Sequence, residues 1–253
     1  MTHLDLELLS CAQIATAGTD PQAIGLITTG AIEQHGPHLP VCTDTTLGRA
    51  VARGVANRLP VPVLTTGTIS PGVSDVHLAF PGTIAVPEDV FEGLVLCHIQ
   101  ALARIGLRRV AIIDCNVPNV AVTKRAVLQA ARELPGLQVI VYDDVDALMA
   151  ALWSGADPGA GSGADHAGRL ETSIMLNLVG PDAVRPYDGL QGFTDFAEEG
   201  WWGRMEREGI DSLSANGIIG IPAGASAEEG GRMVSAFVDE CCSWLSREFA
   251  LQA

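Results

Sequence analysis

A short segment near the N-terminus concentrates side chains that bind metal ions. Glu33, His35, His38 and Asp44 fall within twelve residues that are interrupted by glycine and proline. Carboxylates and imidazoles together are typical ligands of Zn, Mn or Fe, whereas Ca and Mg favour oxygen ligands alone. A lone histidine is more often structural, but here a Glu-x-His pair is followed by an aspartate nine residues after the histidine. The segment therefore predicts a site for a divalent transition metal.

The elements that must position this segment alternate between short apolar runs and segments of helical period. The apolar runs are continuous, which is typical of parallel strands covered by helices on both faces. We therefore predict a three-layer α/β/α fold with a mostly parallel central sheet, formed as a single domain over residues 1–253. Ligands of such sheets bind beyond the carboxyl ends of the strands, where the long polar loops lie. The predicted strands are 23–28, 61–66, 109–114 and 138–142, and the predicted helices are 45–59, 88–105, 120–134, 144–153, 166–179 and 228–249, with residues 180–217 irregular.

Charge and composition exclude several classes of protein. The 253 residues include 15 Lys and Arg against 30 Asp and Glu, which gives a formal net charge of −15. Nucleic acid and anionic membranes are not expected as main partners, because both require basic patches. With 47% hydrophobic and 18% charged residues, the chain is not disordered. The expected partner is a small-molecule substrate.

The cysteines and the N-terminus indicate a reducing environment. Six cysteines are scattered without a CxxC pair, and the N-terminal MTHLDLELLS lacks a basic segment followed by an apolar one. We expect free thiols and a cytoplasmic location. The most apolar helical segment, 90–105, is interrupted by polar side chains, so it is predicted to be amphipathic rather than membrane-spanning.

Three motifs, in order over residues 20–180, resemble the creatininase family of metal-dependent amidohydrolases. Residues 33–45 read EQHGPHLPVCTDT, residues 72–83 read GVSDVHLAFPGT, and residues 166–173 read HAGRLETS. They are similar to the family's EQHGPH and TDT segment, its HxxFPGT segment and its HAGExETS segment. The resemblance implies a creatininase-like fold and a homo-oligomer, often a hexamer.

The same resemblance implies roles for individual residues. Glu33, His35 and Asp44 fall at metal-ligand positions, with Asp44 at the position that bridges two ions. His166 falls at the family's catalytic histidine, and Glu171 at an acidic position of the same site, although a salt bridge on a helix face is the alternative for Glu171. Residues five apart on a helix point about 140° away from each other. If both side chains face the site, His166 must therefore lie before the helix proper.

Two positions depart from the family pattern. Where the family has NGHGGN with a metal-binding histidine, residues 114–119 read DCNVPN, and Asn116 replaces that histidine. An amide is a poor ligand for a transition metal, so we expect fewer than the family's two ions. Arg169 replaces an acidic residue and either binds a substrate carboxylate or phosphate or is a surface residue. His77 is either a site residue or a loop histidine bonded to the backbone. Asn116, Arg169 and His77 are thus the candidates for substrate binding.

The expected function is metal-dependent cleavage, or reversible closure, of a C–N bond in a small amide, lactam or formamide. Zn, Mn or Fe would activate water and polarise the carbonyl, and His166 and Glu171 would act as acid–base residues. The alternative is a metal-depleted paralogue that catalyses a non-hydrolytic cyclisation, dehydration or isomerisation, or that only binds a ligand. Trp201 and Trp202 are expected either to cover a pocket for a flat substrate or to form a subunit contact.

Overall fold

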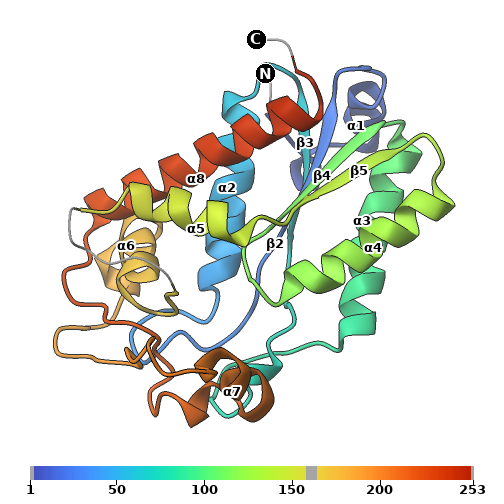
Figure 1. The fold of residues 1–253 in the computed structure, drawn as a ribbon. Coiled ribbons are helices and arrows are strands. Elements are labelled where there is room, and N and C mark those ends of the chain that lie inside the picture. The colour runs from blue at the N-terminus through green and yellow to red at the C-terminus, as the bar shows by residue number, and fades with distance from the viewer. Residues whose placement is uncertain (1–2, 158–163, 252–253) are drawn as a thin grey trace.

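A computed structural model describes residues 3–157 and 164–251 as a sheet between two layers of helices (Figure 1). All neighbouring strands run parallel, in the order β1-β3-β2-β4-β5. The predicted three-layer α/β/α fold is therefore confirmed, whereas the single domain over residues 1–253 stays a prediction. The strands are β1 (His3–Asp5), β2 (Ile24–Thr29), β3 (Val63–Ile69), β4 (Arg109–Asp114) and β5 (Gln138–Tyr142).

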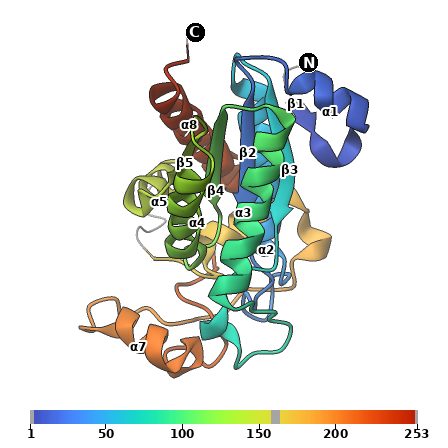
Figure 2. The ribbon, with the colours of Figure 1, turned by 90° about the vertical axis from the view of Figure 1, so that its right-hand side faces the viewer.

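Helices cover both faces of this sheet (Figure 2). They are α1 (Cys11–Ala17), α2 (Thr43–Arg58), α3 (Glu88–Ile105), α4 (Asn119–Glu133), α5 (Val145–Ser154), α6 (Arg169–Leu178), α7 (Trp201–Glu208) and α8 (Ala227–Glu248). One apolar core lies between the sheet and α2, α5, α6 and α8, and a second lies between the sheet and α3 and α4. All residues of β2 are buried, which explains its continuous apolar run. Within the described residues, no helix is both long and apolar enough to cross a membrane.

Several elements differ from the sequence prediction. Strand β1 and helix α1 are not predicted, because three and seven residues are too few to show a clear period. Helix α7 lies inside the segment expected to be irregular, and of its eight residues it buries only Met205. Helix α6 begins at Arg169 rather than at residue 166. The reason is that Ala167 adopts a φ of 54°, in the left-handed region, which a right-handed helix cannot include.

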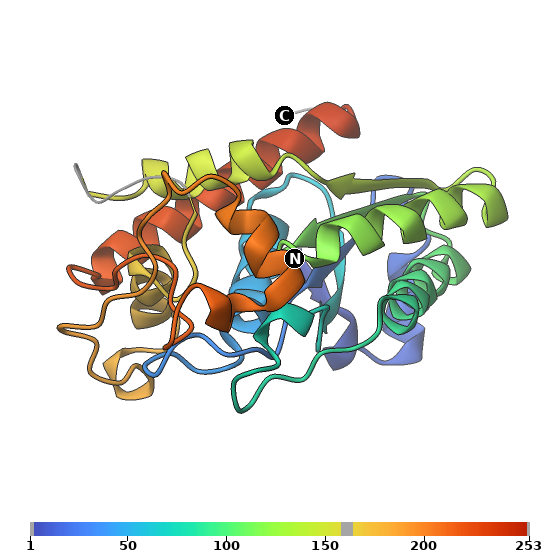
Figure 3. The ribbon, with the colours of Figure 1, turned by 60° about the horizontal axis from the view of Figure 1, so that its bottom comes forward.

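The loops that carry the candidate site leave the sheet at one edge. Strands β3 and β4 pair with opposite sides of β2, so the carboxyl ends of all three lie next to one another. Chain segments that diverge from neighbouring parallel strands leave a crevice, which is where open α/β sheets bind ligands. In Figure 3, which brings this edge forward, α7 lies in front of the strand ends. The sheet thus supplies one wall of a site and α7 supplies another.

Helices α6 and α8 approach each other closely at Gly230. A Cβ atom added to Gly230 would lie 1.9 Å from the carbonyl oxygen of Ser173, far inside van der Waals contact. Because α6 carries Glu171 in its first turn, this approach also determines how far that carboxylate reaches toward the strand ends.

We predict that Gly230→Ala lowers the free energy of unfolding by about 1–3 kcal/mol or more, because overpacking forces backbone shifts. Gly93→Ala is the matched control: Gly93 also lies within a helix, but its added Cβ would meet nothing within 4 Å. That control should gain about 0.5–1 kcal/mol from reduced chain entropy. Denaturant unfolding of both variants measures the difference, and equal effects would contradict the close approach.

Candidate active site

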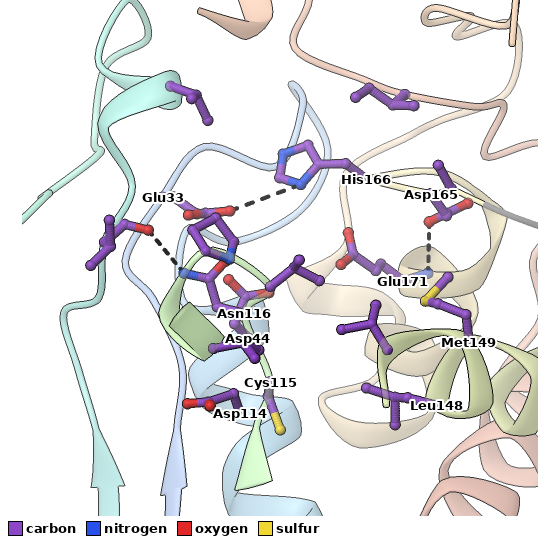
Figure 4. Close-up of a pocket in the computed structure, with 18 of the residues that line it drawn as sticks. Glu33, Asp44, Asp114, Cys115, Asn116, Leu148, Met149, Asp165, His166 and Glu171 are labelled. Carbon is purple, nitrogen blue, oxygen red and sulfur yellow. Dashed lines mark hydrogen bonds and ion pairs between the residues drawn. The ribbon is translucent and has the colours of Figure 1, made fainter. Parts of the chain in front are cut away.

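A cavity of about 520 Å³ lies at the carboxyl edge of the sheet. Figure 4 shows its acidic and imidazole side chains converging from the loop after β2, from α2 and from the start of α6. Of the residues singled out in the sequence, His35 lies buried behind the cavity wall, and His38, Arg169 and Trp201 do not line the cavity. Those that line it are Glu33, Asp44, His77, Asn116, His166, Glu171 and Trp202.

The loop after β2 is compact enough to bring its side chains to one place. Gly30 packs directly against the start of α2, where a Cβ would lie 2.6 Å from the backbone nitrogen of Thr45. The backbone nitrogen of Glu33 donates to the carbonyl of Val41 over 2.9 Å, which closes the loop on itself. Asp44 then follows in the first turn of α2. The sequence spacing from residue 33 to residue 44 is thus folded back into a single cluster.

Three ligand-type side chains of this loop converge. Ligand atoms of Glu33, His35 and Asp44 all lie within 4.8 Å of one another. His35 Nε2 lies 3.2 Å from Asp44 Oδ1 and 3.5 Å from Glu171 Oε2, so the carboxylate of α6 joins the same cluster. The convergence expected from the spacing is present, while a metal-binding role stays a prediction.

The protonation of His35 follows from its backbone partner. Its Nδ1 lies 3.1 Å from the carbonyl oxygen of Glu33, which can only accept, so Nδ1 carries a proton and Nε2 is the ring nitrogen left to face the site. Nε2 faces the carboxylates of Asp44 and Glu171. Burial alone would lower the pKa of His35, but the two carboxylates raise it well above its usual value. The space between these three groups therefore favours a positive charge.

Unpartnered atoms around this space show what kind of cation fits. Glu33 Oε2, Asp44 Oδ2 and His35 Nε2 are buried and have no hydrogen-bond partner. Burial, and then repulsion from Asp44, raise the pKa of Glu33 to about 8. A buried unpaired polar atom is costly, and a divalent metal would satisfy all three at once. One imidazole with carboxylates is a donor set that suits Zn or Mn, so the residues fit the expected metal.

Gln34 determines which ring nitrogen of His77 carries the proton. Its Oε1 accepts from the backbone nitrogen of Gly36 over 2.9 Å, which fixes the orientation of the amide. The Nε2 group then donates to the carbonyl of Gly217 at 3.1 Å and lies 2.9 Å from both His77 Nδ1 and His166 Nε2, with one proton left to donate. Because His166 Nε2 itself donates to the Gln34 carbonyl, that proton goes to His77 Nδ1, and His77 carries its own proton on Nε2, which faces Glu33 Oε1 at 3.2 Å. In this tautomer His77 orients the Glu33 carboxylate, and its ligand nitrogen also belongs with Glu33 and His166 to a second group of ligand atoms within 4.8 Å of one another.

His166 has the opposite arrangement. Its Nε2 lies 2.9 Å from the carbonyl oxygen of Gln34, to which it donates, so Nδ1 keeps its lone pair and lies 3.9 Å from Glu33 Oε1. Burial, together with repulsion from His35 and His77, lowers the pKa of His166 well below its usual value. Backbone hydrogen bonds in both directions with Ile219 hold the residue in place.

The first turn of α6 brings Glu171 beside His166. Ala167, in its left-handed conformation, separates the two, so His166 precedes the helix as the five-residue spacing requires. The Ala167 backbone nitrogen donates to Glu171 Oε2 over 2.6 Å. Burial opposes ionisation of Glu171, but His35 outweighs it and lowers the pKa to about 2. Asp165, which accepts from backbone nitrogens of this turn, stabilises the same geometry.

Two residues that were predicted to bind the substrate form hydrogen bonds with other groups of the protein. The Arg169 guanidinium forms a bidentate pair with the buried Glu229, at 3.0 and 3.1 Å, instead of facing the cavity. This pairing supplies the counter-charge that a buried carboxylate 60 residues away needs, and the binding of a substrate anion by Arg169 stays a prediction. Asn116 lines the cavity, but its Nδ2 donates to the carbonyl of Val73 over 3.1 Å and holds the loop after β3.

Two residues of this site were missed by sequence reasoning. Gln34 stands inside the EQH segment, but a neutral amide draws no attention in a search for ligands and acids. Asp165 directly precedes the HAG segment, where an acidic side chain near a helix start is a capping signal. Both act by fixing neighbours rather than by reacting, and such roles depend on contacts distant in sequence.

Comparisons with known proteins agree with this geometry. The chain matches the family model described as "Creatininase: Creatinine amidohydrolase" over residues 7–245. It is 32% identical over 251 residues to a "Mycofactocin precursor peptide peptidase" of Mycobacterium tuberculosis, covering 95% of this chain and 91% of the relative. It is also 32% identical over 175 residues to a "Creatinine amidohydrolase" of Pseudomonas putida, covering 63% of this chain and 65% of the relative.

Solved structures share the fold. A crystal structure of creatinine amidohydrolase superposes with a TM-score of 0.77 at 24% identity, covering 98% of this chain and 99% of the other. Further creatininase structures described as "Mn" and as "Zn-Zn type" have TM-scores of 0.75 and 0.76 at 23% identity, covering 98% and 99% of this chain and 100% of each of the others. At these identities the likeness establishes the fold.

We predict that His35→Ala lowers the affinity for Zn²⁺ or Mn²⁺ by about 100-fold or more, since even residues that only orient a ligand contribute about 10–100-fold. Elemental analysis after dialysis measures the metal retained per chain. A chelator should also lower the melting temperature of the wild type but not of the variant, because an ion that binds only the folded state stabilises it. His98→Ala is the matched control, since His98 lies outside the site and bonds to Thr66. Equal metal retention in both variants would contradict the assignment.

We also predict that Arg169→Met lowers the free energy of unfolding by about 3–5 kcal/mol, because it leaves Glu229 buried without its counter-charge. The double variant Arg169→Met with Glu229→Gln should recover much of that loss. Denaturant unfolding measures both. If stability were unchanged while substrate affinity fell, Arg169 would after all serve the substrate.

Proposed function

The chain belongs to the creatininase family of amidohydrolases, and from this premise we propose that it is a metal-dependent hydrolase of C–N bonds. One observation carries the metal dependence: the unpartnered Glu33 Oε2, Asp44 Oδ2 and His35 Nε2 converge where a cation is needed. When bound, a divalent ion supplies Lewis acidity that polarises a carbonyl and activates water. Glu33, His35, Asp44 and Glu171 are the residues that would hold it.

We further propose that fewer than two ions are bound. Asn116 stands where the family has a metal-binding histidine, and its amide nitrogen is already used by the Val73 carbonyl. His77 groups with Glu33 and His166 rather than with His35 and Asp44, and its Nε2 directs a proton toward Glu33. Related creatininases described with Mn and with Zn support these two metals as the first to test, with Fe as a third.

The acid–base work is proposed for His166 and Glu171. His166 is neutral, and its tautomer directs the Nδ1 lone pair toward Glu33 and the cavity. Nδ1 is therefore placed to take a proton from water and to pass it to the leaving nitrogen. Glu171 is ionised and shares the space around His35 Nε2, so it can orient the imidazole side of the site and accept a proton there.

The substrate class is proposed as a small amide, lactam or formamide. A cavity of about 520 Å³ suits such molecules. One end of a peptide would also fit, and the relatives described as peptide peptidases support that second class. The cytoplasmic location and the homo-oligomer, a hexamer by resemblance, remain parts of the proposal.

A non-hydrolytic or ligand-binding paralogue is the second candidate, and Asn116 is the observation that favours it. The two candidates differ in their need for metal. Turnover that rises with added Zn²⁺ or Mn²⁺ and releases an amine supports the hydrolase. A protein that retains no metal and rearranges its substrate without uptake of water supports the paralogue.

We predict that His166→Ala and Glu171→Gln each lower kcat by about 10²–10⁴-fold, the usual contribution of acid–base catalysis. Small lactams, formamides, cyclic ureides and peptide amides, with and without added Zn²⁺ or Mn²⁺, are the substrates to screen. Glu208→Gln is the matched control, because Glu208 is exposed and does not line the cavity. Circular dichroism verifies that the variants are folded. A substrate whose turnover is indifferent to both substitutions would show that the assignment is wrong.

A further inference from the structure

We propose that the substrate carries an organic cation, a protonated amine, beside the amide that is cleaved, and that Trp202 and Glu206 of α7 recognise it. The inference rests on the proposed function for its reaction, but its evidence comes from the wall opposite the metal-ligand cluster. That wall includes Trp202, which packs against Trp201 and which the catalytic arrangement does not use.

The cavity lining is rich in acidic side chains. Among the described residues that line it, there is no lysine or arginine, and the undescribed segment 158–163 reads PGAGSG, without a charged side chain. The acidic residues that line it are Glu33, Asp44, Asp75, Glu88, Asp114, Asp165, Glu171 and Glu206. A substrate carboxylate or phosphate would find no counter-charge on the protein here.

Arg169 and Arg125 do not make the cavity more favourable for an anionic substrate. Arg169 is committed to the buried Glu229. Arg125 pairs with Glu88 and Glu92 and offsets only one of the acidic lining residues. A divalent ion would offset charge among Glu33, Asp44 and Glu171, which leaves Asp75, Asp114, Asp165 and Glu206 without a basic partner among the described residues. Asp114 and Asp165 accept from hydroxyl groups and backbone nitrogens, so Asp75 and Glu206 are the exposed carboxylates of this set.

Helix α7 adds an aromatic surface to this charge. The Trp202 Nε1 donates to Glu206 Oε1 over 2.7 Å, so the indole and the carboxylate stand side by side one turn apart on the cavity wall. Trp202 is 42% exposed, and its ring is held edge-on by Trp201, 5.4 Å away at 78°. An indole face next to a carboxylate attracts cations through the ring quadrupole and through charge together. The pair thus has the composition of an ammonium site.

The apolar part of the cavity wall fits the apolar body of such a substrate. Val73, Val117 and Pro118 line the cavity on the side of the strand ends, and Met149 and Met205 line it elsewhere. Val117 is 41% exposed although it is apolar, so a ligand in the cavity would cover it. A substrate with an amide, an apolar body and an ammonium group matches the metal-ligand cluster, this apolar wall and the Trp202–Glu206 pair, in that order.

Three amides test the inference, sharing one acyl group and one amine arm that ends in an ammonium, a methyl or a carboxylate group. We expect kcat/KM to be about tenfold higher for the ammonium amide than for the methyl amide, and lowest for the carboxylate. The advantage should shrink when NaCl is raised from 0.1 to 1 M, since screening shortens from about 10 to about 3 Å. Trp202→Leu and Glu206→Gln should each remove most of it through KM, while Glu208→Gln on the same helix should not. Equal kcat/KM for the ammonium and methyl amides would overturn the inference.

Binding separates this inference from the proposed function. If none of the three amides is cleaved, hydrolysis fails, but choline and its neutral carbon isostere 3,3-dimethyl-1-butanol still probe the cation site. We expect choline to bind at least about tenfold more tightly in a calorimetric titration, with the difference lost in Trp202→Leu and retained in Glu208→Gln. Equal affinities of the two probes, or a difference that survives Trp202→Leu, would show that the α7 surface does not recognise a cation.

Discussion

Buried negative charge around His35 is the constraint on which the rest of the site depends. The Asp44 and Glu171 carboxylates both face Nε2 of this fully buried imidazole, and Glu33 adds a further carboxylate within reach. In a low-dielectric interior, such a group is stable only around a cation. The protein does not relieve the repulsion with a lysine or an arginine of its own, since none lines the cavity among the described residues. The same buried charge makes the cluster fit the metal ion that we propose, and it makes the cavity unfavourable for an anionic substrate.

Neutral groups determine where the protons lie. Backbone carbonyls fix the tautomers of His35 and His166, and one amide, Gln34, fixes that of His77. As a result, His166 directs the lone pair of Nδ1 toward Glu33, His77 presents a proton to Glu33, and His35 directs Nε2 toward Asp44 and Glu171. This division cannot be deduced from which residues are titratable, because it is decided by acceptors that carry no charge. The scaffold also depends on a specific partner, because Arg169 at the start of α6 neutralises the buried Glu229. Glu171 lies in the same first turn of α6.

Prediction from sequence was most accurate where a repeating apolar pattern exists. The four longer strands and the helices α2, α3, α4, α5 and α8 lie close to their predicted residues, since burial on one or both faces imposes a period that can be read along the chain. It failed for β1, α1 and α7, which are short and bury little, and at the start of α6, where a single left-handed alanine interrupts the helix. These elements are formed by packing against partners distant in the sequence, so local pattern carries little information about them.

The fold class, the family and the ligand-type residues could be predicted from the sequence, because they depend on local apolar period and on the spacing of Glu33, His35, Asp44, His166 and Glu171 in three motifs. What the remaining polar groups do became clear only from the folded structure. It assigned Arg169 to Glu229, turned the Asn116 amide to the loop after β3, made His77 an orienting group and placed Trp202 beside Glu206 on the cavity wall. A motif records which residues are near each other along the chain. The partner of a charged or hydrogen-bonding group is set by which distant segment the fold brings within about 3 Å of it.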